Sequence, residues 1–208
     1  MEGKNRTLEG KLLPLVEDFF TIQGEGYHMG TPAYFIRIGG CDVGCSWCDS
    51  KFSLNPDIHP LVETDAIVDK VLSSGAGTVV VTGGEPLMWN LDYLCKSLRN
   101  NNIKTFIETS GAHELSGYWD WICLSPKKNH PPVDYICGKA HELKVIIENL
   151  EDFTWAEEYR LKVNNRCKLY LQPEWSRFNG IIHEIVEYVK INQYWSISIQ
   201  AHKYMRIP

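Results

Sequence analysis

The sequence predicts an α/β fold in which mainly parallel strands form an incomplete barrel or an open sheet with short, trimmed helices. Segments of β-branched and apolar residues recur along the chain, and amphipathic helical patterns lie between several of them. Strands that alternate with helices across short loops are typical of a parallel sheet. Between residues 108 and 143 the sequence has no long helical pattern but several glycines and prolines. We therefore expect at least one strand connection to be a loop.

The expected elements can be placed along the chain from these patterns. Strands are expected where short apolar or alternating segments occur, at residues 33–38, 78–82, 103–108, 121–124, 143–147, 168–171 and 196–200. Helices are expected where apolar residues recur at helical spacing, at residues 64–73, 90–101, 152–161 and 181–191. The sequence has no internal repeat and no linker-like stretch, so we expect residues 1–208 to form a single domain.

The composition excludes several classes of protein. Hydrophobic residues make up 44% of the 208 residues and charged residues 23%, which is typical of an ordered globular chain. Lys and Arg number 21 against 26 Asp and Glu, and no basic stripe occurs, so we expect no nucleic-acid partner. No apolar run approaches the length of a membrane span, and residues 1–6 lead into no signal-like apolar segment. We therefore expect a cytoplasmic protein without a membrane partner.

Motifs that can carry chemistry follow five of the expected strands. They begin at the carboxyl ends of those strands, at Cys41, Gly83-Gly84-Glu85-Pro86, Thr109-Ser110-Gly111, Ser125-Pro126-Lys127 and Gln172-Pro173-Glu174. The carboxyl ends of parallel strands meet at one rim of a sheet or barrel, and active sites of α/β proteins lie there. We therefore expect these five loops to surround one site.

Three of the seven cysteines, Cys41, Cys45 and Cys48, form a C-x3-C-x2-C motif. Three thiolates on one loop can bind three irons of a cubic iron–sulfur cluster and leave the fourth iron without a protein ligand. A zinc site, with His28 or His59 as a fourth ligand, is the main alternative, but structural zinc usually takes four protein ligands from paired cysteine motifs. The remaining cysteines are isolated and are expected to be small buried hydrophobes, namely Cys95, Cys123, Cys137 and Cys167.

These motifs together resemble the radical S-adenosylmethionine superfamily. The cysteine triplet follows the first strand of the expected barrel, Trp47 precedes its last cysteine, and Gly-Gly-Glu-Pro follows the second strand. The resemblance implies that Cys41, Cys45 and Cys48 bind a 4Fe–4S cluster and that S-adenosylmethionine chelates its open iron. Reductive cleavage of that cofactor would then give a radical that abstracts a substrate hydrogen. It also implies an electron donor such as flavodoxin or ferredoxin.

Seven segments, in order along the chain, further resemble the 7-carboxy-7-deazaguanine synthase family. They are residues 20–26, 30–33, 35–37, 48–50, 125–127, 172–173 and 200–208. The resemblance implies an abbreviated, incomplete (β/α) barrel of the radical S-adenosylmethionine type and a homodimeric carbon–nitrogen lyase of queuosine biosynthesis, the pathway to this tRNA modification. Its reaction would be the radical ring contraction of 6-carboxy-5,6,7,8-tetrahydropterin to 7-carboxy-7-deazaguanine, with loss of ammonia.

The same resemblance implies roles for individual residues. Those expected to bind the pterin are Ile22, Gln23, Gly24, Arg37, Thr82 and the main-chain carboxylate of Pro208. Those expected to contact S-adenosylmethionine are Trp47, Cys48, Asp49, Gly84, Ser125, Pro126, Lys127, Gln172, Pro173, Glu174 and Trp175. Ser50 stands where the family typically has a threonine that helps to bind Mg²⁺, and it keeps the hydroxyl, so we still expect Mg²⁺ there. No catalytic residue is implied beyond the cluster and the radical derived from S-adenosylmethionine.

Two other functions are compatible with parts of the sequence. A radical activase, which places a glycyl radical on a protein partner, would share the short barrel and the cysteine triplet but would not explain the Gln23-Gly24-Glu25-Gly26 segment. A non-catalytic zinc-binding adaptor would explain only the cysteines. Glu25 is interpreted either as a structural turn carboxylate or as an acceptor for a purine-like edge. The histidines are expected to lie on the surface or in satisfied core positions.

Overall fold

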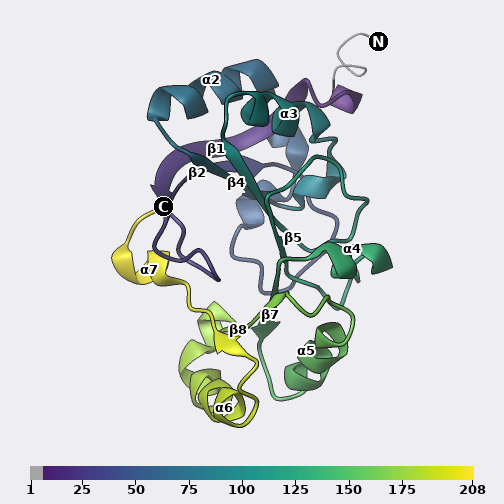
Figure 1. The fold of residues 1–208 in the computed structure, drawn as a ribbon, viewed down its shortest axis with the longest axis vertical. Coiled ribbons are helices and arrows are strands. Elements are labelled where there is room, and N and C mark those ends of the chain that lie inside the picture. The colour runs from purple at the N-terminus through teal and green to yellow at the C-terminus, as the bar shows by residue number, and fades with distance from the viewer. Residues whose placement is uncertain (1–6) are drawn as a thin grey trace.

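Within residues 7–208, which the computed structural model describes, nine strands form one sheet in the order β3-β1-β2-β4-β5-β6-β7-β8-β9 (Figure 1). Residues 1–6, over which no signal sequence is expected, lie outside the described residues. The strands are β1 (Leu12–Ile22), β2 (Pro32–Ile38), β3 (Leu61–Glu63), β4 (Thr78–Gly83), β5 (Lys104–Thr109), β6 (Trp121–Leu124), β7 (Glu142–Ile147), β8 (Lys168–Pro173) and β9 (Ser196–Ile197). The α-helices are α2 (Thr64–Ser74), α3 (Asp92–Asn100), α4 (Asp134–Lys139), α5 (Asp152–Arg160), α6 (Phe178–Ile191) and α7 (Ala201–Met205).

Neighbouring strands pair in parallel along the part of the sheet that runs β2-β4-β5-β6-β7-β8-β9. The strand β1 pairs antiparallel with both β2 and β3. At the centre of the sheet Ile36 lies opposite Val81, and Val81 lies opposite Ile107; all three are fully buried. Because the strands run in parallel, their carboxyl ends and the loops that follow them share one rim. The expected open sheet of mainly parallel strands is therefore confirmed.

The helices pack on this sheet where apolar spacing predicts them. Helices α2 and α3 contact each other and cover the half that contains β1 and β5, while α5 and α6 lie against β7 and β8 (Figure 1). Between β5 and β7 the only α-helix among the described residues is α4, with six residues, as the lack of a long helical pattern predicts. No helix in the described part of the chain is both long and apolar enough to cross a membrane.

Five elements differ from the sequence prediction, and two of them, the three-residue strand β3 and the six-residue helix α4, are too short to give a periodic pattern. The strand β1 was not expected because its alternation is broken: a β-bulge lies between Leu15 and Glu17, and Leu13, Pro14 and Leu15 are buried in succession. The last expected strand, residues 196–200, is only two residues long in β9. The short helix α7 that follows it buries no residue, so it has no apolar periodicity that a sequence pattern could reveal.

Leu94 of α3 is expected to contribute strongly to stability. Its side chain is fully buried, so Leu94→Ala removes apolar contacts and leaves a cavity, which should lower the free energy of unfolding by about 2–5 kcal/mol. Leu72→Ala in α2 is the matched control because Leu72 is 40% exposed, and its loss should be less than about 1 kcal/mol. Urea denaturation followed by circular dichroism measures both, and equal losses would contradict this packing.

Candidate active site

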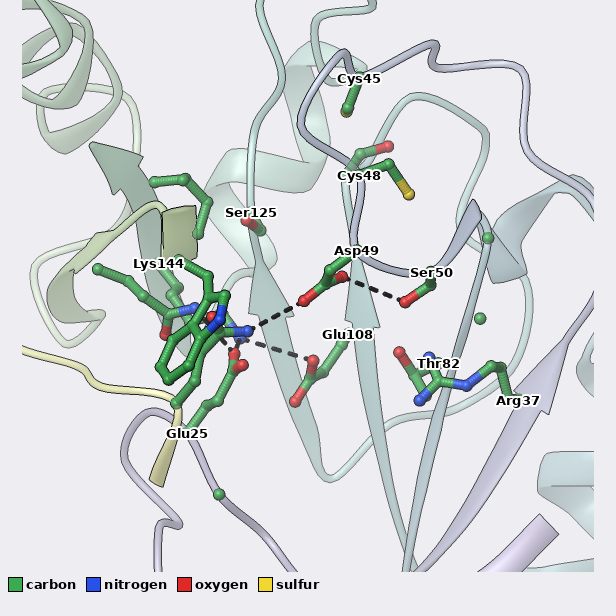
Figure 2. Close-up of a pocket in the computed structure, with 18 of the residues that line it drawn as sticks. Glu25, Arg37, Cys45, Cys48, Asp49, Ser50, Thr82, Glu108, Ser125 and Lys144 are labelled. Atoms are coloured by element: carbon green, nitrogen blue, oxygen red, sulfur yellow. Dashed lines mark hydrogen bonds and ion pairs between the residues drawn. The ribbon is translucent and has the colours of Figure 1, made fainter. Parts of the chain in front are cut away.

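A cavity of about 260 Å³ lies at the carboxyl ends of the parallel strands (Figure 2). Every residue that the sequence analysis assigned to the pterin, S-adenosylmethionine, the cluster or Mg²⁺ lines this cavity, with the exception of Pro126. Pro126 is buried, and its neighbours Ser125 and Lys127 line the cavity instead. The structure thus brings the five expected loops together around one cavity.

The cysteine loop forms one wall of the cavity. Cys41, Cys45 and Cys48 all line it with free, half-buried thiols, whereas the four isolated cysteines are buried as expected. The backbone N–H of Gly40 donates to the carbonyl oxygen of Ser53 at 2.8 Å, and that of Cys41 donates to the carbonyl oxygen of Leu54 at 3.1 Å. These two hydrogen bonds close the loop. Burial raises the pKa of the Cys41 and Cys45 thiols, and a metal would have to displace those protons on binding.

Two further hydrogen bonds hold the outer side of the cysteine loop. Asn129 Nδ2 donates to the carbonyl oxygen of Gly44 at 2.8 Å, and His113 Nε2 lies 2.9 Å from Asp42 Oδ1. The two histidines considered as zinc ligands do not line this cavity. Nε2 of His28 is buried without a hydrogen-bond partner among the described residues, so this histidine does not occupy the satisfied core position that was expected. His59 Nε2 lies 2.8 Å from the carbonyl oxygen of Phe52, and the ring of His28 packs on Trp121 with centroids 4.5 Å apart.

The backbone of Gly83 and Gly84 passes directly beside the cysteine loop. A Cβ atom at Gly84 would lie 2.2 Å from the carbonyl oxygen of Gly40 and 2.8 Å from Cys41 Cβ, so a side chain there would clash. Gly83 has a φ of +149°, and its Cβ would lie 2.0 Å from the carbonyl oxygen of Ile38. Three thiols can bind a cubic iron–sulfur cluster. The backbone of Gly83 and Gly84, which no side chain covers, lies beside them and can form main-chain contacts with a ligand of that cluster.

The carboxylate of Glu85 joins the ends of β4 and β5. It is 1% exposed and accepts hydrogen bonds from Thr109 Oγ1 at 2.5 Å, from Ser110 N at 2.7 Å and from Ser110 Oγ at 2.5 Å. Its backbone N–H donates to the carbonyl oxygen of Gly40 at 2.8 Å. Glu85 therefore holds the loop after β5, the Gly-Gly-Glu-Pro turn and the cysteine loop in one arrangement.

A buried lysine and two carboxylates form the floor of the cavity (Figure 2). Lys144 Nζ donates to Glu25 Oε2 and lies 3.5 Å from Glu108 Oε2. Burial opposes the charge of Lys144, but Glu108 and Glu25 outweigh it and hold the pKa of Lys144 well above its usual value. Burial also opposes the charge of Glu25, yet Lys144 outweighs it and lowers the pKa of Glu25. Gln23 Nε2 donates to Glu108 Oε1 at 2.9 Å, and Gln172 Nε2 to Glu25 Oε2 at 3.2 Å.

Arg37 and Thr82 lie on the opposite side of the cavity from Glu25 and Lys144 (Figure 2). They are paired in the register of β2 and β4, so their side chains leave adjacent strands at the same level. Arg37 Nε donates to Glu17 Oε1 at 2.7 Å. This bond fixes the guanidinium and leaves its two terminal nitrogens available to an anion, since no hydrogen bond of theirs is found within residues 7–208.

The remaining wall is built from the loops after β6 and β8. Lys127 Nζ donates to the carbonyl oxygen and the hydroxyl of Ser125, both at 2.6 Å, and lies 5.7 Å from the ring centroid of Trp47. Burial lowers the pKa of Lys127. Glu174 accepts from the backbone N–H groups of the turn that follows it, at 3.0 Å from both Ser176 and Arg177.

Several residues of the cavity were not predicted to act there. They are Glu85, Glu108, Lys144, Gln200 and His202. The position of Lys144 within the apolar run Leu143–Ile147 could have indicated a buried ion pair, because a charged residue inside a buried strand needs a partner. Glu108 ends a strand next to the Thr109-Ser110-Gly111 motif, so its position was also informative. Nothing in the isolated sequence of α7 distinguishes His202 from a surface histidine.

Comparisons with known proteins agree with this geometry. The profile of the radical SAM superfamily matches residues 35–154. A 7-carboxy-7-deazaguanine synthase from Flavobacterium psychrophilum is 55% identical over 96% of this chain and 95% of its own length. A protein of the same name from Synechocystis is 43% identical over 93% of each chain. The crystal structure of QueE from Escherichia coli has a TM-score of 0.83 and 28% identity, and covers 95% of this chain and 98% of its own. The chain therefore belongs to the 7-carboxy-7-deazaguanine synthase family of the radical SAM superfamily.

Proposed function

We propose that this chain converts 6-carboxy-5,6,7,8-tetrahydropterin to 7-carboxy-7-deazaguanine and ammonia, as the name of its relatives indicates. The product and ammonia together contain the atoms of the substrate, so the conversion is a redox-neutral rearrangement and elimination. One observation carries the proposal: a cavity beside the cysteine loop has two carboxylates on its floor and an arginine on the facing side. This charge pattern fits a planar ligand with a donor-rich edge and a carboxylate at its other end.

Membership of the radical SAM superfamily implies a 4Fe–4S cluster and S-adenosylmethionine. Cys41, Cys45 and Cys48 would hold the cluster, and Gly84 and the loops after β6 and β8 would contact S-adenosylmethionine. When bound, this cofactor pair supplies the radical that takes a hydrogen from the substrate. The chain itself has to orient the substrate, keep water from the radical and hold the departing nitrogen.

The floor residues can recognise the pterin through its amino edge. The carboxylates of Glu25 and Glu108 are acceptors, and a 2-amino-4-oxo pyrimidine ring presents N–H groups to such acceptors. The amide of Gln23 already donates to Glu108, which fixes the orientation of both groups. On the facing side the free nitrogens of Arg37 can bind the substrate carboxylate as a fork, with the Thr82 hydroxyl beside them.

Several finer statements belong to the same proposal. Ser50 lines the cavity, and its Oγ lies 3.2 Å from Asp49 Oδ1, so it could offer a hydroxyl to a Mg²⁺ ion that the substrate and water also ligate. We further infer a single radical SAM domain over residues 1–208, a homodimer, a cytoplasmic location and an electron donor such as flavodoxin or ferredoxin. The homodimer and the electron donor rest on the family resemblance, whereas the single domain and the cytoplasmic location rest on the sequence pattern.

The function is tested by anaerobic reconstitution of the full chain with iron and sulfide. The reconstituted protein is incubated with 6-carboxy-5,6,7,8-tetrahydropterin, S-adenosylmethionine and dithionite, and products are identified by mass spectrometry. Formation of 7-carboxy-7-deazaguanine without a protein acceptor supports the synthase and contradicts the activase. A colourless protein that retains zinc instead of iron would support the adaptor and overturn the proposal.

Cys41, Cys45 and Cys48 are each expected to be needed for the cluster. A Cys→Ala change at any of them removes one of three thiolates, so the variant should lose most of its iron and its visible absorption. The matched control is Cys167→Ala, which removes a buried thiol outside the cavity and should keep the parent's iron content. Full iron loading in any triplet variant would refute the assignment.

Arg37→Lys is expected to weaken pterin binding while leaving S-adenosylmethionine binding unchanged. Lysine keeps the positive charge but loses the planar fork and the Nε bond to Glu17, so the KM for the pterin should rise about tenfold. Steady-state kinetics with each substrate varied in turn separates the two effects. An unchanged KM for the pterin would place Arg37 outside the substrate site.

Ser50 is expected to bind Mg²⁺ through its hydroxyl. Ser50→Ala should raise the Mg²⁺ concentration needed for half-maximal turnover about tenfold, because a ligand oxygen is lost. Ser50→Thr keeps the oxygen and restricts its rotamer, so its activity should equal or exceed that of the parent. Product formation is measured against Mg²⁺ concentration for the three proteins, and an unchanged dependence in Ser50→Ala would place the ion elsewhere.

A further inference from the structure

A lysine and a glutamine join the C-terminal segment, residues 200–208, to the cysteine loop. Lys203 Nζ donates to Asp49 Oδ2 and to Gln200 Oε1, both at 3.0 Å. The amide of Gln200 donates to the same Asp49 oxygen at 3.2 Å, and the ammonium lies 4.7 Å from the ring centroid of Trp175. Asp49 stands between Cys48 and Ser50. This ammonium thus links the last helix to the loop that carries the cysteines.

The C-terminal segment also forms part of the pterin side of the cavity. The backbone N–H of Ala201 donates to the carbonyl oxygen of Gly24 at 2.9 Å, and both His202 and Pro208 line the cavity. The carbonyl oxygen of Pro208 accepts from Thr21 Oγ1 at 3.5 Å, a long hydrogen bond. The segment therefore contacts residues from both ligand sites.

Little else holds this segment in place. Helix α7 has five residues and buries none of them, and it ends at Arg206 with a left-handed φ of 54°. Besides its polar contacts, the segment packs the ring of Tyr204 against Trp175 and Phe178, with centroids 5.5 Å and 6.1 Å apart. An element with so few contacts opens more easily than the core. Lys203 adds an ion pair with Asp49, a hydrogen bond to Gln200 and a cation–π contact with Trp175 to these contacts.

We propose that Lys203 is a positioning residue that couples the binding of S-adenosylmethionine to the binding of the pterin. Its pairing with Asp49 holds the C-terminal segment against the cysteine loop, so the two walls of the cavity are ordered together. A ligand that orders the cysteine loop then also orders His202 and Pro208 for the pterin, and by linkage the pterin strengthens binding of the first ligand by the same factor. The inference rests on the proposed function only for the identity of the two ligands.

The size of the effect follows from the type of interaction. The Lys203 side chain is 21% exposed and that of Asp49 is 56% exposed, so solvent weakens the ion pair, while the contact with Trp175 adds to it. An exposed ion pair together with a cation–π contact corresponds to a change of about 5- to 30-fold in an equilibrium constant. We expect a shift of that size when the ammonium is removed.

The test compares three variants of the full-length, reconstituted protein. Lys203→Met removes the charge but keeps the aliphatic stem, Lys203→Arg keeps the charge, and Lys190→Met is a control. Lys190 is 64% exposed and, within residues 7–208, pairs with Glu187 of its own helix alone. Carboxypeptidase Y shortens the chain from its C-terminus, and mass spectrometry follows the rate with and without S-adenosylmethionine. Iron content and the KM values for both substrates are measured in parallel.

In the parent, S-adenosylmethionine should slow the digestion. In Lys203→Met, digestion should be about 5- to 30-fold faster, protection by S-adenosylmethionine should be lost, and the KM for the pterin should rise by a similar factor at unchanged iron content. Lys203→Arg should restore protection, and Lys190→Met should match the parent. Digestion of Lys203→Met at the parent rate, with protection retained, would overturn the coupling. Failure of the proposed function would appear differently, as absence of the product even in the parent, because the digestion readout needs no turnover.

Discussion

The arrangement of the loops around the cavity depends on one buried carboxylate, that of Glu85. Its two oxygens accept three hydrogen bonds from Thr109 and Ser110, and its own backbone N–H reaches Gly40 at the start of the cysteine loop. Removal of this carboxylate would leave those buried donors unpaired, which costs about 1–3 kcal/mol for each group. The parallel register brings β2, β4 and β5 to one rim, but Glu85 fixes how their loops meet there.

The second constraint on the site is electrostatic. Lys144 lies within a buried strand, and an isolated ammonium there would lose its proton or destabilise the fold. Glu25 and Glu108 prevent this by pairing with it, which leaves a floor with one cation between two anions. Lys144 lowers the pKa of Glu25 and so keeps that carboxylate ionised, and both carboxylates line the cavity as acceptors. A neutral ligand edge rich in N–H groups can bind there without bringing a counter-ion of its own.

The parallel half of the fold was predictable because apolar segments of four to six residues repeat between helical patterns, as in β4 and β7. Its antiparallel edge was not, because the bulge between Leu15 and Glu17 breaks the alternation that identifies a strand. The cavity was predictable as a place, since motifs at the carboxyl ends of parallel strands must meet. The partnership of Lys144 with Glu25 was not, because 119 residues separate the two in sequence and only the closure of the fold around the cavity brings them together.

That closure is made by loops rather than by strands. Strands β3 and β9 are the edges of the sheet, and no described strand pairs one with the other. The segment after β1 spans the opening: Gly26 N donates to Ser198 Oγ at 3.0 Å, Tyr27 N to Glu142 Oε2 at 3.3 Å, and Gly24 accepts from the backbone of α7. Gly26 has a φ of +64°, which favours glycine, and a Cβ there would lie 1.9 Å from Glu142 Oε1, so a side chain would also displace that carboxylate. The Gln23-Gly24-Glu25-Gly26 segment thus spans the opening of the sheet and contacts β7, Ser198 and α7, and through these contacts Ile22 at the end of β1 and Pro208 come to line the same cavity.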